Sequence, residues 1–260
     1  MTTAACAWQL DDTRAQTSLG TAGLATVELL QPDRGVQFSL PSTVTPTTVT
    51  PSTAAALHIL GVELEQPLDR STLLDSYPRV DDLVATYAAT ATRPHRVQAY
   101  WKRQFELPAG VAAVIDLQLL TQTDLLDSDP RRTVVSRLSG CEVFKLQRST
   151  TSPTLSPVEC SQRSTTTLGR DAALACCLFR WPGSAMSYVE MVHPLDFYQV
   201  ELRMVGNELQ TTHHLFVDWL EKGVILRSRL RGALVERQND VSLALDLYQQ
   251  LCDSPPPLTT

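Results

Sequence analysis

The stretch that decides the fold is Val224-Ile225-Leu226-Arg227-Ser228-Arg229-Leu230-Arg231-Gly232-Ala233-Leu234-Val235-Glu236. Read with a period of two, it sends its three leucines to one face and its three arginines to the other. Such alternation is typical of a strand in an antiparallel sheet that buries only one face. We therefore predict a long, half-buried strand over residues 224–236.

The three arginines of this strand, Arg227, Arg229 and Arg231, form the candidate ligand-binding site. Alternate residues of a strand lie about 6.5–7 Å apart, so the row is roughly 13 Å long. Guanidinium groups bind carboxylates or phosphates through two parallel hydrogen bonds, which suits a small anionic ligand or an acidic protein partner. The alternative interpretation is a solvated face whose arginines pair with acids on neighbouring strands.

Short runs of strand-like sequence recur through the rest of the chain and indicate a mainly β protein. Twelve short strands are too many for one flat sheet, so we expect a large two-sheet antiparallel β-sandwich. Ala112–Thr121 also has helical propensity, because Ala, Leu and Gln favour helices. The other candidate strands are Ala25–Leu30, Val36–Leu40, Leu57–Leu64, Val80–Tyr87, Arg96–Phe105, Thr133–Leu138, Glu142–Leu146, Ala173–Trp181, Ser187–His193 and Phe197–Val205.

Two helices near the C-terminus are expected to pack on this sandwich. The first follows a threonine N-cap at Thr211 or Thr212, carries an apolar stripe at helical spacing and ends at Gly223. The second begins at Asn239 or Asp240 and has a similar stripe. Both patterns predict helices that cover a sheet.

The length of 260 residues and the hydrophobic content of 43% favour one sandwich domain over residues 1–260. Three polar segments interrupt the strand-like pattern. Residues 41–53 are rich in Pro and Thr and predict an extended loop, residues 148–169 predict a polar loop, and residues 254–260 predict a disordered tail. None of them marks a second domain.

Charge and cysteine content exclude several classes of function. The net charge of −6 argues against nucleic-acid binding. No segment reaches the roughly 18 apolar residues of a membrane span, and no secretory signal opens the chain, so we expect a cytoplasmic protein without a membrane partner. The six cysteines have neither C-x-x-C nor zinc spacing, and no dinucleotide or phosphate-loop motif is present. We therefore expect no metal and no cofactor.

The alternative hypothesis is an enzyme that uses acid–base chemistry. The candidate residues are Glu190, His193 and His214, because histidine titrates near neutral pH and a carboxylate can accept or supply the second proton. Glu190 and His193 would face opposite sides of a continuous strand, whereas a turn at Pro194 would bring His193 close to Asp196. An ordinary structural role for each of these residues is the competing interpretation.

Several phrases together resemble a group of uncharacterised bacterial proteins of the kind found in planctomycetes. The resemblance covers about residues 80–250 and implies no activity and no residue role. The phrases are Asp82-Leu83-Val84-Ala85-Thr86-Tyr87, Val97-Gln98-Ala99-Tyr100-Trp101, Gln122-Thr123-Asp124-Leu125-Leu126-Asp127-Ser128, Tyr188-Val189-Glu190-Met191-Val192-His193-Pro194 and Leu220-Glu221-Lys222-Gly223-Val224-Ile225.

In shape alone, a long antiparallel sandwich resembles the sugar-handling sandwiches of the galactose mutarotase type. That resemblance implies a histidine and a glutamate converging on one concave face. The leading hypothesis is nevertheless a non-catalytic β-sandwich that binds a partner or a small anionic ligand. The alternative is a carbohydrate-active enzyme, such as a mutarotase-like epimerase.

Overall fold

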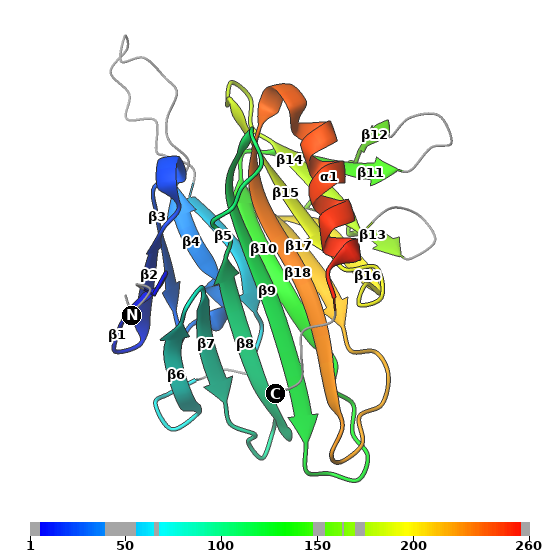
Figure 1. Ribbon diagram of the computed structural model, residues 1–260. Helices are drawn as coiled ribbons and strands as arrows, with labels where there is room; N and C mark the ends of the chain where they lie inside the picture. The colour runs from blue at the N-terminus through cyan, green and yellow to red at the C-terminus, as the bar shows by residue number, and fades with distance from the viewer. Residues whose placement is uncertain are drawn as a thin grey trace.

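Two nine-stranded antiparallel sheets, here named sheets A and B, pack face to face in the computed structural model (Figure 1). The structure describes residues 6–39, 56–64, 68–147, 154–162, 164–169 and 175–255. Sheet A contains, in spatial order, β1 (Gln9–Asp11), β2 (Arg14–Ser18), β3 (Leu24–Glu28), β4 (Val36–Ser39), β5 (Ala56–Val62), β10 (Arg132–Ser139), β17 (Glu208–Leu215), β16 (Gln199–Val205) and β13 (Thr166–Gly169).

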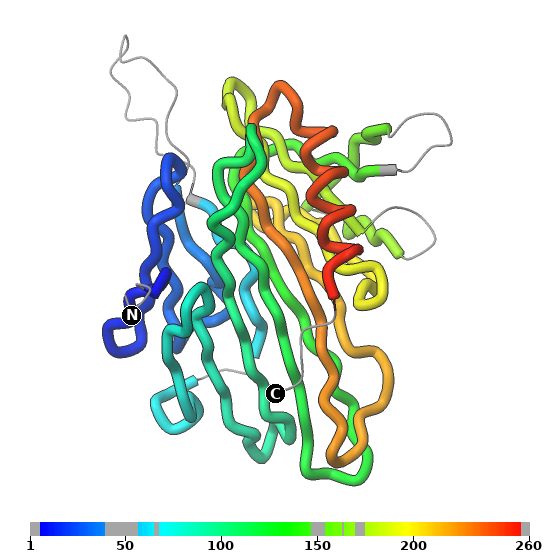
Figure 2. The backbone as a smooth tube through the Cα atoms, viewed as in Figure 1, coloured from blue at the N-terminus to red at the C-terminus, as the bar shows by residue number. Residues whose placement is uncertain are grey.

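Sheet B combines the central part of the chain with the C-terminal strand. Its strands β6, β7, β8 and β9 follow one another as a meander, which can be traced in Figure 2. In spatial order the sheet contains β12 (Thr154–Pro157), β11 (Glu142–Gln147), β14 (Cys176–Arg180), β15 (Met186–Val192), β18 (Ile225–Glu236), β9 (Val111–Thr123), β8 (His95–Arg103), β7 (Asp82–Tyr87) and β6 (Leu73–Arg79).

The predicted long strand is confirmed as β18, and the segment with competing helical propensity is confirmed as β9. These two strands pair along most of their length in the centre of sheet B. Leu230 and Leu234 of β18 are buried between the sheets, whereas the arginines lie on the outer face, as the alternation predicts. The outer face is thus decided by the same period-two pattern that fills the core.

One of the two predicted helices is confirmed. Helix α1 (Asp240–Asp253) packs on the outer face of sheet B over β14, β15 and β18 (Figure 1). Its buried side chains include Ala244, Leu247, Tyr248 and Leu251. Val189 and Met191 of β15 face the helix and are fully buried. The helix therefore covers apolar residues on the outer face of the sheet.

The other predicted helix, starting at Thr211 or Thr212, is wrong, because those residues belong to strand β17. This strand pairs with β10 on one side and β16 on the other. Residues 211–215 alternate in burial, and two ladders of backbone hydrogen bonds outweigh a local helical pattern. Trp219, expected on a buried helical stripe, is 70% exposed in the loop that follows.

The predicted loops have different outcomes. The Pro/Thr-rich segment 41–53 and residues 256–260 of the predicted tail lie outside the described residues. Within 148–169, which was expected to be a polar loop, the short edge strands β12 and β13 form. Three 3-10 turns complete the described elements: η1 (Gly20–Ala22), η2 (Pro32–Arg34) and η3 (Arg237–Asn239).

Turn η2 lies directly on strand β5, and two glycines permit this contact. A Cβ atom at Gly61 would lie 2.1 Å from the Asp33 carbonyl oxygen, and one at Gly35 would lie 2.0 Å from the Ile59 carbonyl oxygen. Gly35 also has a φ of 58°, in the left-handed region that favours glycine. Across the described ranges, no helix has the length and apolar character needed to span a bilayer.

Candidate functional site

Arg231, the last arginine of the predicted row, connects sheet B to α1. Its Nε lies 2.6 Å from Asp116 Oδ1 and its Nη2 lies 3.0 Å from Asp116 Oδ2, while Nη1 donates to the Leu247 carbonyl at 3.3 Å. The residue is buried beneath the helix. These contacts match the interpretation in which the arginines pair with acids on neighbouring strands.

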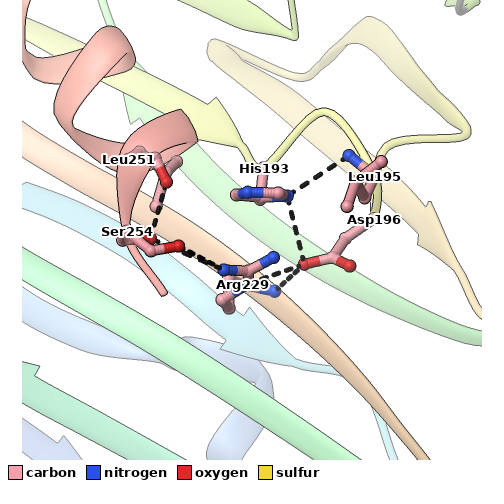
Figure 3. A network of polar contacts seen from close by, with 6 residues as sticks. All are labelled: His193, Leu195, Asp196, Arg229, Leu251 and Ser254. Atoms are coloured by element: carbon pink, nitrogen blue, oxygen red, sulfur yellow. Dashed lines mark hydrogen bonds and ion pairs between the residues drawn. The ribbon is translucent and has the colours of Figure 1, made fainter. Parts of the chain in front are cut away.

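Arg229 ties the end of α1 to the sheet (Figure 3). Its Nε lies 3.2 Å from Asp196 Oδ2, and its Nη1 donates to the Ser254 carbonyl at 3.3 Å. The Ser254 hydroxyl in turn donates to the Leu251 carbonyl at 2.6 Å, which satisfies one of the free carbonyls at the helix end. Arg229 therefore holds the end of α1 on the sheet together with Asp196 and Ser254, and we call this group the helix clamp.

His193 belongs to the same clamp (Figure 3). Its Nδ1 accepts a hydrogen bond from the Leu195 backbone at 3.2 Å and lies 4.0 Å from Asp196 Oδ2. Burial lowers the pKa of His193, and the charge of Arg229 lowers it further, against the opposing effect of Asp196. The expected turn at His193 and Asp196 is present, but it faces the helix end rather than a cavity.

Arg227 is the member of the row that lies beyond α1. Its side chain is half-buried on the outer face of sheet B, where its charge acts on the phenol of Tyr100. Burial raises the pKa of Tyr100, the neighbouring Tyr77 adds to this effect, and Arg79 and Arg227 oppose it. The three arginines thus have three different surroundings and do not form one contact row.

Glu190 is buried between the two sheets, where four side chains surround its carboxylate. His213 Nε2 lies 2.7 Å from Oε1, Thr211 donates to Oε1 at 2.8 Å, and Tyr188 donates to Oε2 at 2.6 Å. Ser136 also donates to Oε2. We call His213 and Glu190 the buried pair.

Burial raises the pKa of the Glu190 carboxyl, but the hydrogen bonds and the charge of His213 prevail, so its pKa is lowered overall. Gly232 lies opposite Glu190 on β18 and makes room for Tyr188, because a Cβ at Gly232 would lie 2.6 Å from the Tyr188 hydroxyl. The network joins β15 of sheet B to β10 and β17 of sheet A. It is a tie between the two layers.

His214 is the next residue on β17 and therefore points to the opposite face. Its Nε2 lies 3.2 Å from Glu201 Oε1, and about a third of each side chain is exposed. We call His214 and Glu201 the surface pair. His214 lines a cleft, and the structure does not bring Glu190, His193 and His214 together.

The cleft beside the surface pair consists of two adjoining hollows that share Arg131 and His214; we call it the His214 cleft. The larger hollow has a volume of about 480 Å³ and the smaller one about 140 Å³. The larger is lined by Asp129, Arg131, Tyr198, Gln199, His214, Val217, Asp218 and Trp219. The smaller is lined by Glu63, Leu64, Arg93, Arg131, Arg132, Thr133, His214 and Leu215.

Two loops at the lower end of the sandwich in Figure 1 form walls of this cleft. The loop after β9 carries Asp129 and the loop after β17 carries Trp219. Ser128 and Leu220 exchange two backbone hydrogen bonds of 3.0 and 2.9 Å, which fasten the loops together. Phe216 has a φ of 57°, and such backbone strain at a bulky residue often accompanies functional sites.

A second layer of polar contacts supports the bridge between the loops. The Ser128 hydroxyl donates to the Leu220 carbonyl at 3.0 Å, His95 Nε2 lies 3.1 Å from that hydroxyl, and Arg132 Nη2 lies 2.9 Å from His95 Nδ1. Because arginine can only donate, Nδ1 is the acceptor and Nε2 carries the proton. Buried and partly buried hydrogen bonds therefore hold the two loops in place.

Charges inside the larger hollow are nearly balanced. Arg131 Nε lies 2.8 Å from one Asp129 carboxylate oxygen and 2.9 Å from the other. Hydrogen bonds from Arg131 lower the pKa of Asp129, so this carboxylate is ionised at neutral pH. The cleft accordingly offers both donors and acceptors beside two aromatic rings.

In the described part of the chain, no three His, Cys, Asp or Glu side chains are grouped as a metal site would require.

Sequence reasoning found His214 but missed the other residues of the cleft. It assigned Trp219 to a buried helix face, left Asp129 and Arg131 in a turn, and placed Tyr198 in the candidate strand Phe197–Val205. The available signal was the exposed position of polar and aromatic residues beside Pro130 and Pro194. That signal is weak, because turn residues have purely structural uses as well.

Comparison with known proteins defines the fold alone. No protein-family model matches the sequence. No curated protein matches it either. The Slr1438 protein from Synechocystis sp. PCC 6803 has a TM-score of 0.52 at 8% identity, over 90% of this chain and 96% of that chain.

Two further solved structures have a related shape. A TPR-domain containing protein from Parabacteroides distasonis ATCC 8503 has a TM-score of 0.50 at 8% identity, over 97% of this chain and 49% of that chain. A galactose mutarotase-like protein from Lactobacillus casei ATCC 334 has a TM-score of 0.49 at 8% identity, over 88% of this chain and 100% of that chain. These likenesses concern the fold alone, and no residue role passes from these proteins to this chain, whose described residues form two antiparallel sheets.

Proposed function

We propose that this chain binds a carbohydrate in the His214 cleft without transforming it. One observation carries the proposal: two exposed aromatic rings, Trp219 and Tyr198, line the same hollow as Asp129, Arg131 and His214. An exposed tryptophan contributes little to folding. Its place beside polar groups that the loops hold rigidly is typical of a binding site.

The chemistry of the cleft suits a sugar. A pyranose ring has C–H faces that pack on aromatic rings and hydroxyl edges that both donate and accept hydrogen bonds. The ion-paired Asp129 and Arg131 offer acceptors and donors side by side. The volume of about 480 Å³ lies within the range of roughly 300–1,000 Å³ that is usual for small-molecule sites.

Tryptophan fluorescence tests the proposal directly. Trp8, Trp101 and Trp181 are buried, whereas Trp219 is 70% exposed, so acrylamide quenching reports mainly on the cleft. We expect that a panel of mono- and disaccharides contains a ligand that protects Trp219 from acrylamide. The same ligand should raise the unfolding temperature, because it binds the folded state selectively.

Three variants sharpen this test. Asp129→Asn and Tyr198→Phe should weaken binding of that ligand, Asp129→Asn by about tenfold for the loss of a charge-assisted hydrogen bond. Phe105→Ala is the matched control, because Phe105 is an exposed aromatic residue outside the cleft. No protection by any sugar, or equal weakening by Asp129→Asn and Phe105→Ala, would refute the proposal.

A second candidate function rests on the surface pair. His214 lines the cleft and lies 3.2 Å from Glu201, an arrangement that could move protons at a bound sugar. In anomer interconversion, a base removes the proton of the anomeric hydroxyl, the bond from C1 to the ring oxygen breaks, and an acid protonates that oxygen. Polarimetry of freshly dissolved sugars tests this function: His214→Asn should abolish any acceleration while sugar binding persists. If the wild type does not accelerate the reaction, this second function is refuted and sugar binding remains the proposed function.

A further inference from the structure

Beyond the His214 cleft, sheet B has an outer surface that α1 leaves uncovered; we call it the open face. Helix α1 packs on β14, β15 and β18, whereas the open face extends over β6, β7, β8, β9 and the start of β18 (Figure 1). Five adjacent strands make it about 19 Å wide. Its principal residues are Tyr77, Arg79, Arg96, Gln98, Tyr100, Lys102, Gln118 and Arg227.

Strand register places these side chains on one surface. Residues directly opposite on neighbouring antiparallel strands point to the same face. One row across the sheet pairs Tyr77 with Val84, Val84 with Tyr100, and Tyr100 with Gln118. The adjacent row leads from Gln98 through Leu120 to Arg227. The same register turns Trp101 and Leu117 inward, where they are buried.

Tyr77 and Tyr100 lie on this outward side, and the Arg79 guanidinium lies 5.9 Å from the centroid of the Tyr100 ring. Val84 lies between Tyr77 and Tyr100 on this outward side, yet it is 0% exposed, so its neighbours cover it. The Tyr100 hydroxyl donates to Gln98 Oε1 at 3.4 Å, two residues along the same strand. The Tyr100 ring therefore leans along the sheet instead of standing upright. Gln98 is itself held by a 3.1 Å hydrogen bond from its Nε2 to Thr86.

The open face is basic, although the chain as a whole is acidic. It carries four cations, Arg79, Arg96, Lys102 and Arg227, and two further carboxylates, Asp75 and Asp82. The whole chain, by contrast, has a net charge of −6. Arg79 and Asp82 form an ion pair at 3.3 Å. Asp116, directly opposite Lys102 on β9, is paired with Arg231, and Asp196 is paired with Arg229. Charge complementarity therefore favours an anionic partner.

We propose that the open face binds an acidic polysaccharide, with tyrosine rings under the sugar units and cations on their carboxylates. Tyrosine rings pack on the C–H faces of sugars, and guanidinium groups pair with carboxylates through two hydrogen bonds. The width of about 19 Å accommodates several sugar units. The residues differ from those of the His214 cleft, so this inference stands apart from the proposed function.

Affinity electrophoresis through gels that contain polygalacturonate tests the proposal, with dextran gels as the neutral comparison. We expect polygalacturonate to retard the wild-type chain at low salt and dextran to leave its mobility unchanged. The triple variant Arg96→Gln/Lys102→Gln/Arg227→Gln should weaken retardation about tenfold or more. Retardation of the wild type should also decline as sodium chloride is added, because salt screens exposed charges.

The matched control is Arg14→Gln/Arg34→Gln/Arg203→Gln, which removes three exposed cations from sheet A and its turn η2 and gives the same net charge. It should weaken retardation less than about twofold. Arg96→Gln/Lys102→Gln alone changes two exposed side chains and tests the proposal even if the triple variant misfolds. Trp219→Ala should leave retardation unchanged.

Equal losses in the two triple variants would assign retardation to overall charge and overturn the proposal. So would the absence of wild-type retardation in polygalacturonate, or equal retardation in dextran. Sensitivity to Trp219→Ala would place the polymer in the His214 cleft instead. Whether the cleft binds small sugars is tested separately by the acrylamide experiment with mono- and disaccharides.

Discussion

Adjacent histidines of β17 form two His–Glu pairs with opposite surroundings. In the buried pair, His213 lies 2.7 Å from Glu190 between the sheets; in the surface pair, His214 lies 3.2 Å from Glu201 at the mouth of a cleft. The two contacts are chemically alike, and the pleat of the strand alone sends them to opposite faces. The comparison teaches that burial decides whether such a pair ties the layers together or meets a ligand.

Three features make the buried pair structural. Its carboxylate receives hydrogen bonds from three hydroxyl groups besides the contact with His213. Its members come from different sheets, so the contact fixes how the layers sit on each other. Its two side chains are almost completely buried, with His213 4% and Glu190 0% exposed. A buried charge of this kind persists in a protein core only when its partners are complete.

The largest expected effect is the removal of Glu190. Glu190→Ala should lower the free energy of unfolding by roughly 3–5 kcal/mol, because it leaves buried donors without an acceptor. Glu201→Ala, the matched change in the surface pair, should cost about 1 kcal/mol or less. Urea titration of the two variants measures the contrast. Similar losses would contradict the distinction between the pairs.

A contact of intermediate burial sharpens the comparison. Asp240 is buried at the start of α1, where Arg180 donates to it at 2.8 and 2.9 Å and Ser187 at 2.7 Å, while Arg180 remains partly exposed. Asp240→Ala should therefore cost about 2–3 kcal/mol, between the losses for Glu190 and Glu201. Chemical denaturation gives this value, and hydrogen exchange should show that α1 loses protection first. A cost below that of Glu201→Ala would break the correlation with burial.

The pH dependence of stability provides a third test. Because burial and Arg229 lower the pKa of His193, the unfolded chain takes up a proton more readily than the folded chain does. This contribution to stability is complete above the unfolded pKa near 6.5 and is lost as the pH falls below it. His193→Gln should therefore flatten the decline in unfolding temperature between about pH 7 and pH 5.

His58, whose pKa is also lowered by burial, contributes a decline in the same range, so His58→Gln should flatten part of the curve as well. His214→Gln is the control, because its partly exposed side chain sits in no comparable clamp. If His193→Gln leaves the curve as steep as the wild type, the helix clamp does not respond to this proton.

The smallest expected effect concerns the stability of the surface pair. His214→Gln should change the free energy of unfolding by about 0.5 kcal/mol or less, as is usual for partly exposed ion pairs. It should nevertheless weaken sugar protection of Trp219, because His214 lines both hollows of the cleft. Parallel denaturation and acrylamide quenching separate the two effects. A large stability loss without a change in protection would make His214 structural.

Much of the fold could be predicted because periodicity reports burial directly. The alternation in residues 224–236 located β18, and the capped apolar stripe after Asn239 located α1. The failure at residues 211–222 has a specific cause. Leu215, Phe216, Trp219 and Leu220 satisfy a helical spacing, but residues 211–215 alternate in burial because β10 and β16 pair with this strand on either side.

A repeated segment shows the same limit. Leu73-Leu74-Asp75-Ser76-Tyr77-Pro78-Arg79 and Leu125-Leu126-Asp127-Ser128-Asp129-Pro130-Arg131 differ at a single position. The first is strand β6, paired with β7, whereas the second is a loop joined to Leu220 by one bridge. Tyr77 and Asp129, the residues that differ, lie in the open face and in the His214 cleft. Nearly identical local sequences therefore took different structures in different surroundings.

By itself the sequence determined which residues avoid water, since apolar spacing along one chain depends only on the geometry of a strand or a helix. It thereby predicted stacked sheets, the long arginine-bearing strand and the last helix. The tertiary structure decided which polar groups meet: it placed Glu190 beside His213, separated the three arginines and assembled the cleft. Such contacts join residues far apart in the chain, and their partners are set by sheet pairing and packing that no local pattern specifies.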